Sequence, residues 1–177
     1  MTLPGIVEFI HGTRQALLAS AEGLTPDQAN FRPGVERWSI GQLLRHVALT
    51  ESGIGRRMEQ LAEQARAQAL PRRVDELVDL AVFERVRQEA AGKRFQAPER
   101  VAPGPELVEL PAAMAELASA RNRVLGVVPT LEAHDMKDVA FPHPFFGDFN
   151  CYQWLYFLGL HEGRHRNQIE AVKSIFA

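Results

Sequence analysis

The pattern of apolar and polar positions along the chain predicts five amphipathic helices. Apolar residues recur three and four positions apart, the spacing that places side chains on one face of a helix. These periodic stretches cover residues 6–18, 40–61, 74–86, 114–128 and 154–176. No alternating stretch is long enough to predict a strand, and no internal repeat is visible. The pattern therefore predicts an all-α bundle.

Capping residues predict where two of the helical segments begin. Thr25 is a suitable N-cap with Pro26 at the first helical position, and Gln28 completes a capping box for a short turn. Ser39 and Gln42 form a second capping box ahead of the second long helix. The start of that helix is therefore well defined.

Glycine and proline residues predict the ends of the other segments. Gly23 is expected to end the first long helix, Gly92 the third and Pro129 the fourth. Residues 98–105 contain three prolines and a glycine, and we expect an irregular crossover there. Neither flank of this crossover could form a core by itself, so residues 1–177 are expected to form a single domain.

Composition narrows the classes of function. Hydrophobic residues make up 46% of the chain, and a net charge of −2 argues against a nucleic-acid or anionic-membrane partner. The longest apolar run, Trp154–Leu160, is far too short to cross a bilayer, and the start of the chain lacks a signal-peptide pattern, so we expect a cytoplasmic protein. Cys151 is the single cysteine, which excludes an intramolecular disulfide and multi-cysteine zinc sites. Any metal must be bound by histidine and carboxylate.

The last predicted helix carries two histidines inside its apolar face. At about 100° per residue, His161 and His165 fall in the same narrow stripe as Trp154, Leu158 and Ile169. Because an unpaired buried polar group costs about 1–3 kcal/mol, both imidazoles need partners. One interpretation is a shared divalent ion, since histidines one helical turn apart can bind the same metal. The other is a pair of hydrogen-bonded core histidines.

Three further side chains have two interpretations each. His46 lies at the edge of the apolar face of the second long helix, either facing across the bundle or as a boundary histidine. His143 stands between two prolines, where it either borders a site formed with the last helix or packs in a rigid turn. Arg121 interrupts the apolar stripe of the fourth helix, and we expect a solvated arginine, with a carboxylate or anionic ligand as the alternative.

Four short segments, taken in order, carry a family resemblance. They are Trp38-Ser39-Ile40 leading into Leu44, His46 and Val47, the stretch Phe95 to Pro105, His143-Pro144 with Gly147, and the group His161, His165, Gln168 and Ile169. Together they resemble the DinB/YfiT-like superfamily over nearly the whole chain.

The resemblance implies a fold and a metal site. The implied fold is a four-helix bundle with long crossover connections and an extra helix between the second and third bundle helices. The implied site holds a divalent metal through one histidine of the second bundle helix and two of the last, with an open position for water. The matching positions here are His46, His161 and His165. Dimers are frequent in bundles of this resemblance, so a homodimer is a further expectation.

A competing motif covers the same residues. His161-Glu162-Gly163-Arg164-His165 also spells the His-Glu-x-x-His signature of zinc peptidases, in which the glutamate is the general base. Those enzymes normally take a third ligand from further downstream. Only twelve residues follow His165, none of them His, Asp or Cys, and Glu170 is the sole carboxylate. A peptidase is therefore kept as a lesser alternative.

Three imidazoles with an open position are typical of a catalytic metal site. On ligand type, Zn²⁺, Ni²⁺, Fe²⁺ or Mn²⁺ would suit it. The ion would activate water or a low-molecular-weight thiol at neutral pH. Glu162 is a candidate base or tautomer-fixing group, and Gln168 a candidate hydrogen-bond partner of a ligand. The alternatives are an exposed glutamate and a packing or capping glutamine.

The function that the resemblance implies is a metal-dependent enzyme of hydrolase or thiol-dependent S-transferase type, acting on a small electrophilic molecule. The first alternative is a non-catalytic, stress-related metal-binding module, and a weaker one is a helical surface for protein partners without metal. An enzyme needs a reachable coordination position beside a pocket, whereas a structural ion would be enclosed and fully ligated.

Overall fold

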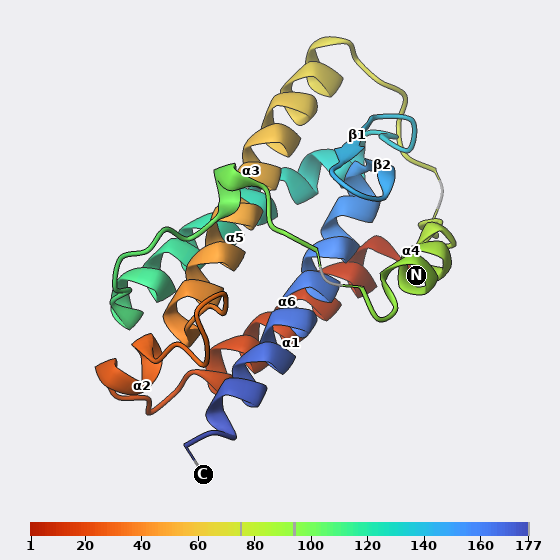
Figure 1. Cartoon of the computed structure of the whole chain (residues 1–177). Coiled ribbons are helices and arrows are strands. Elements are labelled where there is room, and N and C mark those ends of the chain that lie inside the picture. Colours follow the sequence, from red (N-terminus) through yellow and green to blue (C-terminus); the bar gives the residue numbers. More distant parts are fainter. Residues whose placement is uncertain (75, 94, 177) are drawn as a thin grey trace.

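A computed structural model describes residues 1–74, 76–93 and 95–176. Its helices and strands follow one another along the chain as α1 (Leu3–Ser20), α2 (Pro26–Asn30), α3 (Ile40–Ala67), α4 (Val82–Ala90), the 3-10 turn η1 (Glu99–Val101), α5 (Leu110–Ala133), β1 (Ala140–His143), β2 (Gly147–Asn150) and α6 (Cys151–Lys173). The four long helices α1, α3, α5 and α6 pack side by side as a bundle (Figure 1). The predicted four-helix bundle is confirmed.

The directions of the four helices follow from contacts between them. Phe9 stacks on Tyr156 and Arg14 pairs with Glu162, so α1 and α6 run the same way. Residue numbers also rise together in the α3–α5 contacts, from Glu51 with Arg121 to Arg66 with Thr130. Between the two pairs the order reverses, because Arg14 of α1 donates to the carbonyl of Leu117 in α5, whereas the carbonyl of the earlier Ile10 accepts from the later Arg121.

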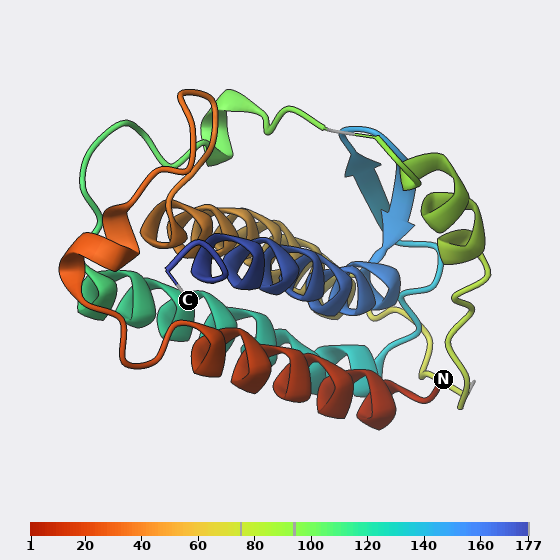
Figure 2. The same ribbon diagram turned by 60° about the horizontal axis from the view of Figure 1, so that its bottom comes forward.

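The parallel arrangement of α3 and α5 requires a long return. The described residues between α3 and α5 run back along the bundle, and they include α4 and η1. Figure 2 shows this crossover passing over the face of the bundle formed by α3 and α6. The extra helix expected between the second and third bundle helices is α4.

Side-chain capping boxes set the starts of α2, α3 and α6. Thr25 with Gln28, and Ser39 with Gln42, form the predicted capping boxes. A third box, which sequence reasoning missed, joins Asn150 to the Gln153 amide at 2.9 Å and starts α6 directly after β2. Each box satisfies amide donors that the first helical turn leaves free.

Two predicted helix boundaries are wrong. The apolar positions 74–86 do not form one helix, because α4 begins only at Val82; residue 75 of that range lies outside the described residues. Leu77 is 68% exposed and forms an isolated β-bridge with Thr2. It fits the helical spacing of apolar residues in the sequence, but it is not part of a buried helix face. Pro129 was expected to end the fourth helix, but it lies inside α5, which continues to Ala133. A proline removes one amide donor from a helix but does not end every helix.

A short hairpin connects α5 to α6, where no strand was expected. β1 and β2 are antiparallel, with Ala140 opposite Asn150 and His143 opposite Gly147. The strands have four residues each, too few for an alternating pattern to be recognised. Trp154 of α6 donates its indole N–H to the carbonyl of Phe141 at 3.2 Å, which ties the hairpin to the first turns of α6.

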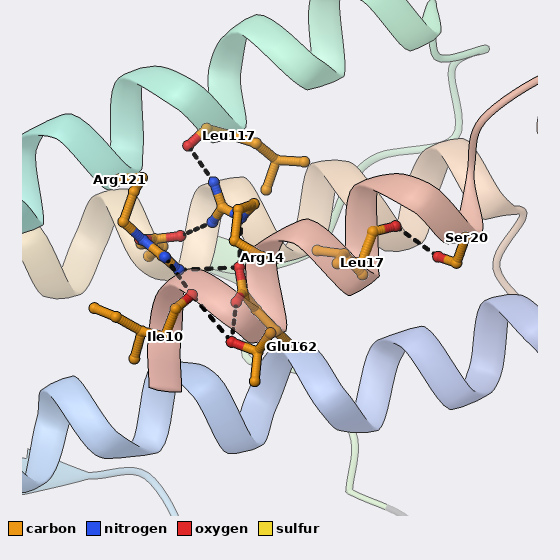
Figure 3. A network of polar contacts seen from close by, with 9 residues as sticks. Ile10, Arg14, Leu17, Ser20, Leu117, Arg121 and Glu162 are labelled. Carbon is orange, nitrogen blue, oxygen red and sulfur yellow. Dashed lines mark hydrogen bonds and ion pairs between the residues drawn. The ribbon is translucent and has the colours of Figure 1, made fainter. Parts of the chain in front are cut away.

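The bundle core consists of two apolar clusters. The cluster nearer the hairpin includes Ile10, Ile54, Val124 and Leu158. The other cluster includes Leu17, Ala48, Leu117 and Ile169. Between these positions each helix contributes one buried charged residue, and we call this set the polar layer: Arg14, Glu51, Arg121 and Glu162. Figure 3 shows side chains of this layer meeting between the helices.

No helix in the described parts of the chain has the length and apolar character that a bilayer crossing requires.

Candidate metal centre

Three histidines from two helices meet on the face of the bundle covered by the crossover. His46 comes from α3, and His161 and His165 come from adjacent turns of α6. One ring nitrogen from each lies within 4.8 Å of the others. The ring centroids are 4.4–5.2 Å apart. The structure thus brings together the three positions singled out in the sequence.

Hydrogen bonds at the outer ring nitrogens set the orientation of two of these imidazoles. The Nδ1–H of His46 donates to the carbonyl of Val101 at 2.8 Å, and the Nδ1–H of His165 donates to Oε1 of Gln168 at 2.7 Å. A neutral imidazole that is protonated at Nδ1 presents a lone pair at Nε2. Both rings therefore offer Nε2 as a ligand atom, and metal-binding histidines are commonly held in this way.

The distance between the two α6 histidines fits a shared ion. Their Nε2 atoms are 3.1 Å apart. Two nitrogens bound at 2.0–2.1 Å to a tetrahedral zinc would be roughly 3.3 Å apart. A hydrogen bond between the rings also fits 3.1 Å, so this distance alone does not decide between the two. The third histidine, which offers its own Nε2 beside the pair, favours the ion.

The surroundings keep the three imidazoles neutral. Burial lowers the pKa of His46, and burial together with the neighbouring His46 lowers the pKa of His165 to about 3. Burial likewise lowers the pKa of His161 well below its ordinary value, with a further contribution from His165. Neutral imidazole is the form that binds a metal, so at pH 7 no proton has to be displaced.

The three histidines lie in the wall of an open cleft of about 1620 Å³. The cleft is bounded by α3, the crossover, the hairpin and α6, and its apolar lining includes Trp38, Phe95, Phe146 and Phe157. A shallower hollow of about 560 Å³ near His134 contains none of the three. A ligand bound in the large cleft could therefore reach the histidines from one side.

His143 is part of this cleft but not of the histidine cluster. It ends β1, its ring stacks on Phe146 at 4.7 Å, and its Nδ1 accepts from the Phe145 amide at 3.1 Å. Burial lowers the pKa of His143 to about 4. Both interpretations from the sequence apply, because the residue shapes a tight turn and also lines the site.

Glu162 faces the interior of the bundle and is only 1% exposed. Its carboxylate accepts from Arg14 Nε at 2.6 Å, from Thr13 Oγ1 at 2.7 Å and from Arg121 Nη2 at 3.1 Å. These partners lie on α1 and α5, whereas the histidines of the same helix meet His46 of α3. The alternative of an exposed glutamate is wrong, and the contacts favour a structural role over proton transfer at the metal centre.

Arg121 is buried as well, so the expectation of a solvated arginine is wrong. It is 5% exposed, and its Nε donates to Glu51 at 2.6 Å while Nη1 donates to the carbonyl of Ile10 at 2.6 Å. Sequence reasoning missed its partner Glu51, and it missed Arg14, the second arginine that pairs with Glu51 and Glu162. The sequence did contain a signal for such partners, namely a charged residue inside an otherwise apolar stripe. Arg14, for example, lies between Ile10 and Leu17.

Comparisons with known proteins show the family of the chain. The model of the DinB superfamily matches residues 10–169. The chain belongs to the DinB superfamily. The match spans all three histidines and the whole polar layer.

The chain is also similar to one protein in sequence and to two solved structures in fold. The chain is 26% identical to the uncharacterized protein YuaE of Bacillus subtilis (strain 168) over 153 residues, which are 86% of this chain and 88% of YuaE. The crystal structure of TT2238, a four-helix bundle protein, has a TM-score of 0.64 at 22% identity, covering 96% of this chain and 99% of TT2238. An uncharacterised Escherichia coli UTI89 protein has a TM-score of 0.57 at 13% identity, covering 98% and 93%. These structures support the DinB four-helix fold.

Proposed function

We propose that this DinB protein binds one divalent metal ion through His46, His161 and His165 and acts as a metal-dependent enzyme. The reaction class is hydrolysis or thiol-dependent S-transfer on a small electrophilic molecule. The observation that carries the proposal is the direction of the imidazoles. Two Nδ1 protons are used in hydrogen bonds away from the cluster, and the ligand nitrogens converge at the wall of an open cleft.

A bound ion would supply Lewis acidity, which brings the pKa of a coordinated water or thiol close to 7. The chain's own residues prepare the site. The Val101 carbonyl and the Gln168 amide oxygen hold two ligands in the metal-binding tautomer. The ring of Trp38 lies 4.8 Å from the ring of His46 and limits the water around that ligand. The open side of the cleft admits the electrophile.

The alternative of a non-catalytic metal-binding module has less support. A structural ion is usually enclosed by four protein ligands, whereas the present cluster offers three and borders a large cleft. The peptidase alternative has less still. Its general base would be Glu162, and the carboxylate of Glu162 is held by Arg14 and Arg121. On ligand type, Zn²⁺, Ni²⁺, Fe²⁺ and Mn²⁺ all remain compatible with the site.

The proposal can be tested with a panel of small electrophiles, supplied with and without low-molecular-weight thiols. Metal-loaded wild-type protein should consume at least one of them, and His165→Ala should lose that activity together with the metal. His11→Ala is the matched control, because His11 is an exposed histidine of α1 outside the cleft. Equal turnover by all three proteins, or turnover that survives metal removal, would overturn the proposal.

A further inference from the structure

The cleft beside the metal centre has a positive lining. Among the described lining residues are five arginines, namely Arg37, Arg56, Arg57, Arg100 and Arg164, against a single carboxylate, Glu36. All five are exposed, and in the described part of the chain none forms a salt bridge with an aspartate or glutamate. The whole chain has a net charge of −2, so positive charge is concentrated in this cleft.

Three of these arginines come from segments that also contact or supply the histidines. Arg164 lies on α6 between the two α6 histidines, Arg100 directly precedes Val101, and Arg37 directly precedes Trp38. The guanidinium of Arg164 lies 5.4 Å from the centre of the Phe95 ring, and Phe95 also lines the cleft.

A second observation is an unused hydroxyl group. Oγ1 of Thr50 is buried and has no hydrogen-bond partner among the described residues. Thr50 lies one helical turn after His46 on α3 and lines the same cleft. A buried hydroxyl without a partner is unfavourable, and a polar ligand atom in the cleft would satisfy it.

The lining of the cleft is also aromatic. Phe95, Phe146, Trp154 and Phe157 all border it, and ring contacts such as Phe95 with Phe146 at 5.3 Å join them into one surface. Aromatic surfaces of this kind bind the flat or apolar body of a ligand, whereas free guanidinium groups bind carboxylate, sulfonate or phosphate.

We propose that the cleft takes anionic molecules with an apolar or aromatic body, and that Arg164 binds their anionic group beside the metal centre. As a statement about the substrate of the enzyme, this inference rests on the proposed function. As a statement about binding, it can be tested on protein without metal.

The test compares two probes of similar shape, 2-naphthalenesulfonate and the neutral 2-naphthalenemethanol, by calorimetric titration of metal-free and zinc-loaded protein. We expect the sulfonate to bind about tenfold more tightly than the alcohol, a difference of about 1.4 kcal/mol, and to weaken as salt is added. Arg164→Met should lose most of this preference while its affinity for the alcohol stays the same.

Arg166→Met is the matched control, because Arg166 is an exposed arginine of the same helix that does not line the cleft. Arg100→Met provides a second variant in case Arg164→Met does not fold. The proposal is overturned if the two probes bind equally, if neither binds, or if the Arg164 and Arg166 variants lose the same affinity. If His165→Ala protein binds no zinc but still prefers the sulfonate, anion binding does not depend on the metal site. The inference about the cleft and the proposed function can therefore fail independently.

Discussion

Glu51 is the residue of the polar layer whose substitution tests the packing of the bundle most sharply. It is 1% exposed and accepts hydrogen bonds from Arg14 and, at 2.6 Å, from Arg121. Glu51→Gln preserves the shape but removes the charge and turns an N–H₂ group toward one of the two arginines. The layer contains two arginines and two glutamates, so the change leaves one buried positive charge without compensation.

Breaking a buried ion pair by removing one partner costs about 3–5 kcal/mol. A domain is stable by only about 5–15 kcal/mol, so this loss is a large fraction of the free energy of unfolding. At this chain length we expect the melting temperature to fall by about 6–20 °C. Urea unfolding followed by circular dichroism measures the free-energy change directly.

Glu59→Gln is the matched control on the same helix. Glu59 also pairs with an arginine, Arg123, at 2.5 Å, but its side chain is 39% exposed. A surface pair of this kind contributes only about 0–1 kcal/mol. If Glu51→Gln and Glu59→Gln cost the same free energy, the assignment of the polar layer as a tightly coupled structural unit is refuted. Arg121→Met combined with Glu51→Gln should also show a coupling energy of about 1–3 kcal/mol.

Three further predictions concern the helix contact, the hairpin and the metal centre. Gly159→Ala would place a methyl group 2.8 Å from Cδ1 of Phe9 and should cost about 1–3 kcal/mol in urea unfolding, whereas Gly163→Ala, with open space around it, should stabilise by about 0.5–1 kcal/mol. The pKa of His143 is lowered to about 4, so the folded protein binds fewer protons than the unfolded chain between that value and about 6.5. The free energy of unfolding should therefore fall as the pH falls through this window, by at most about 1.4 kcal/mol per pH unit. The fall should be smaller in His143→Gln. Parallel curves of unfolding free energy against pH for the two proteins would contradict this. Gln168→Ala should keep the metal but weaken its affinity about tenfold in a chelator competition, and unchanged affinity would show that the hydrogen bond to the ligand is unimportant.

Local features of the fold were predictable from the sequence because their causes are local. The capping boxes of Thr25 and Ser39 involve residues three positions apart, and the structure has both. The short strands were not predictable, since four residues carry too little periodicity. The spacing at 74–86 indicated a helix in error because Val74 and Leu77 are largely exposed.

The candidate site shows the same division. The spacing of His161 and His165 on one helix face could be read directly, and the position of His46 beside them followed from the family resemblance. The partners of Glu162 could not be read, because Arg14 is 148 residues away in the chain and meets it only when α1 packs on α6. Charged residues inside apolar stripes indicate that such partners exist, but they do not identify them.

The central claim is that His46 completes a metal site with two histidines of another helix, and metal content measures this directly. Elemental analysis should be carried out on protein purified without an affinity tag, for wild type, His46→Ala and His11→Ala. We expect about one divalent ion per chain in wild type and in the His11 variant, and almost none in the His46 variant, because two ligands on one helix bind far more weakly than three. Wild-type protein without stoichiometric metal, or a His46 variant that keeps it, would contradict the claim.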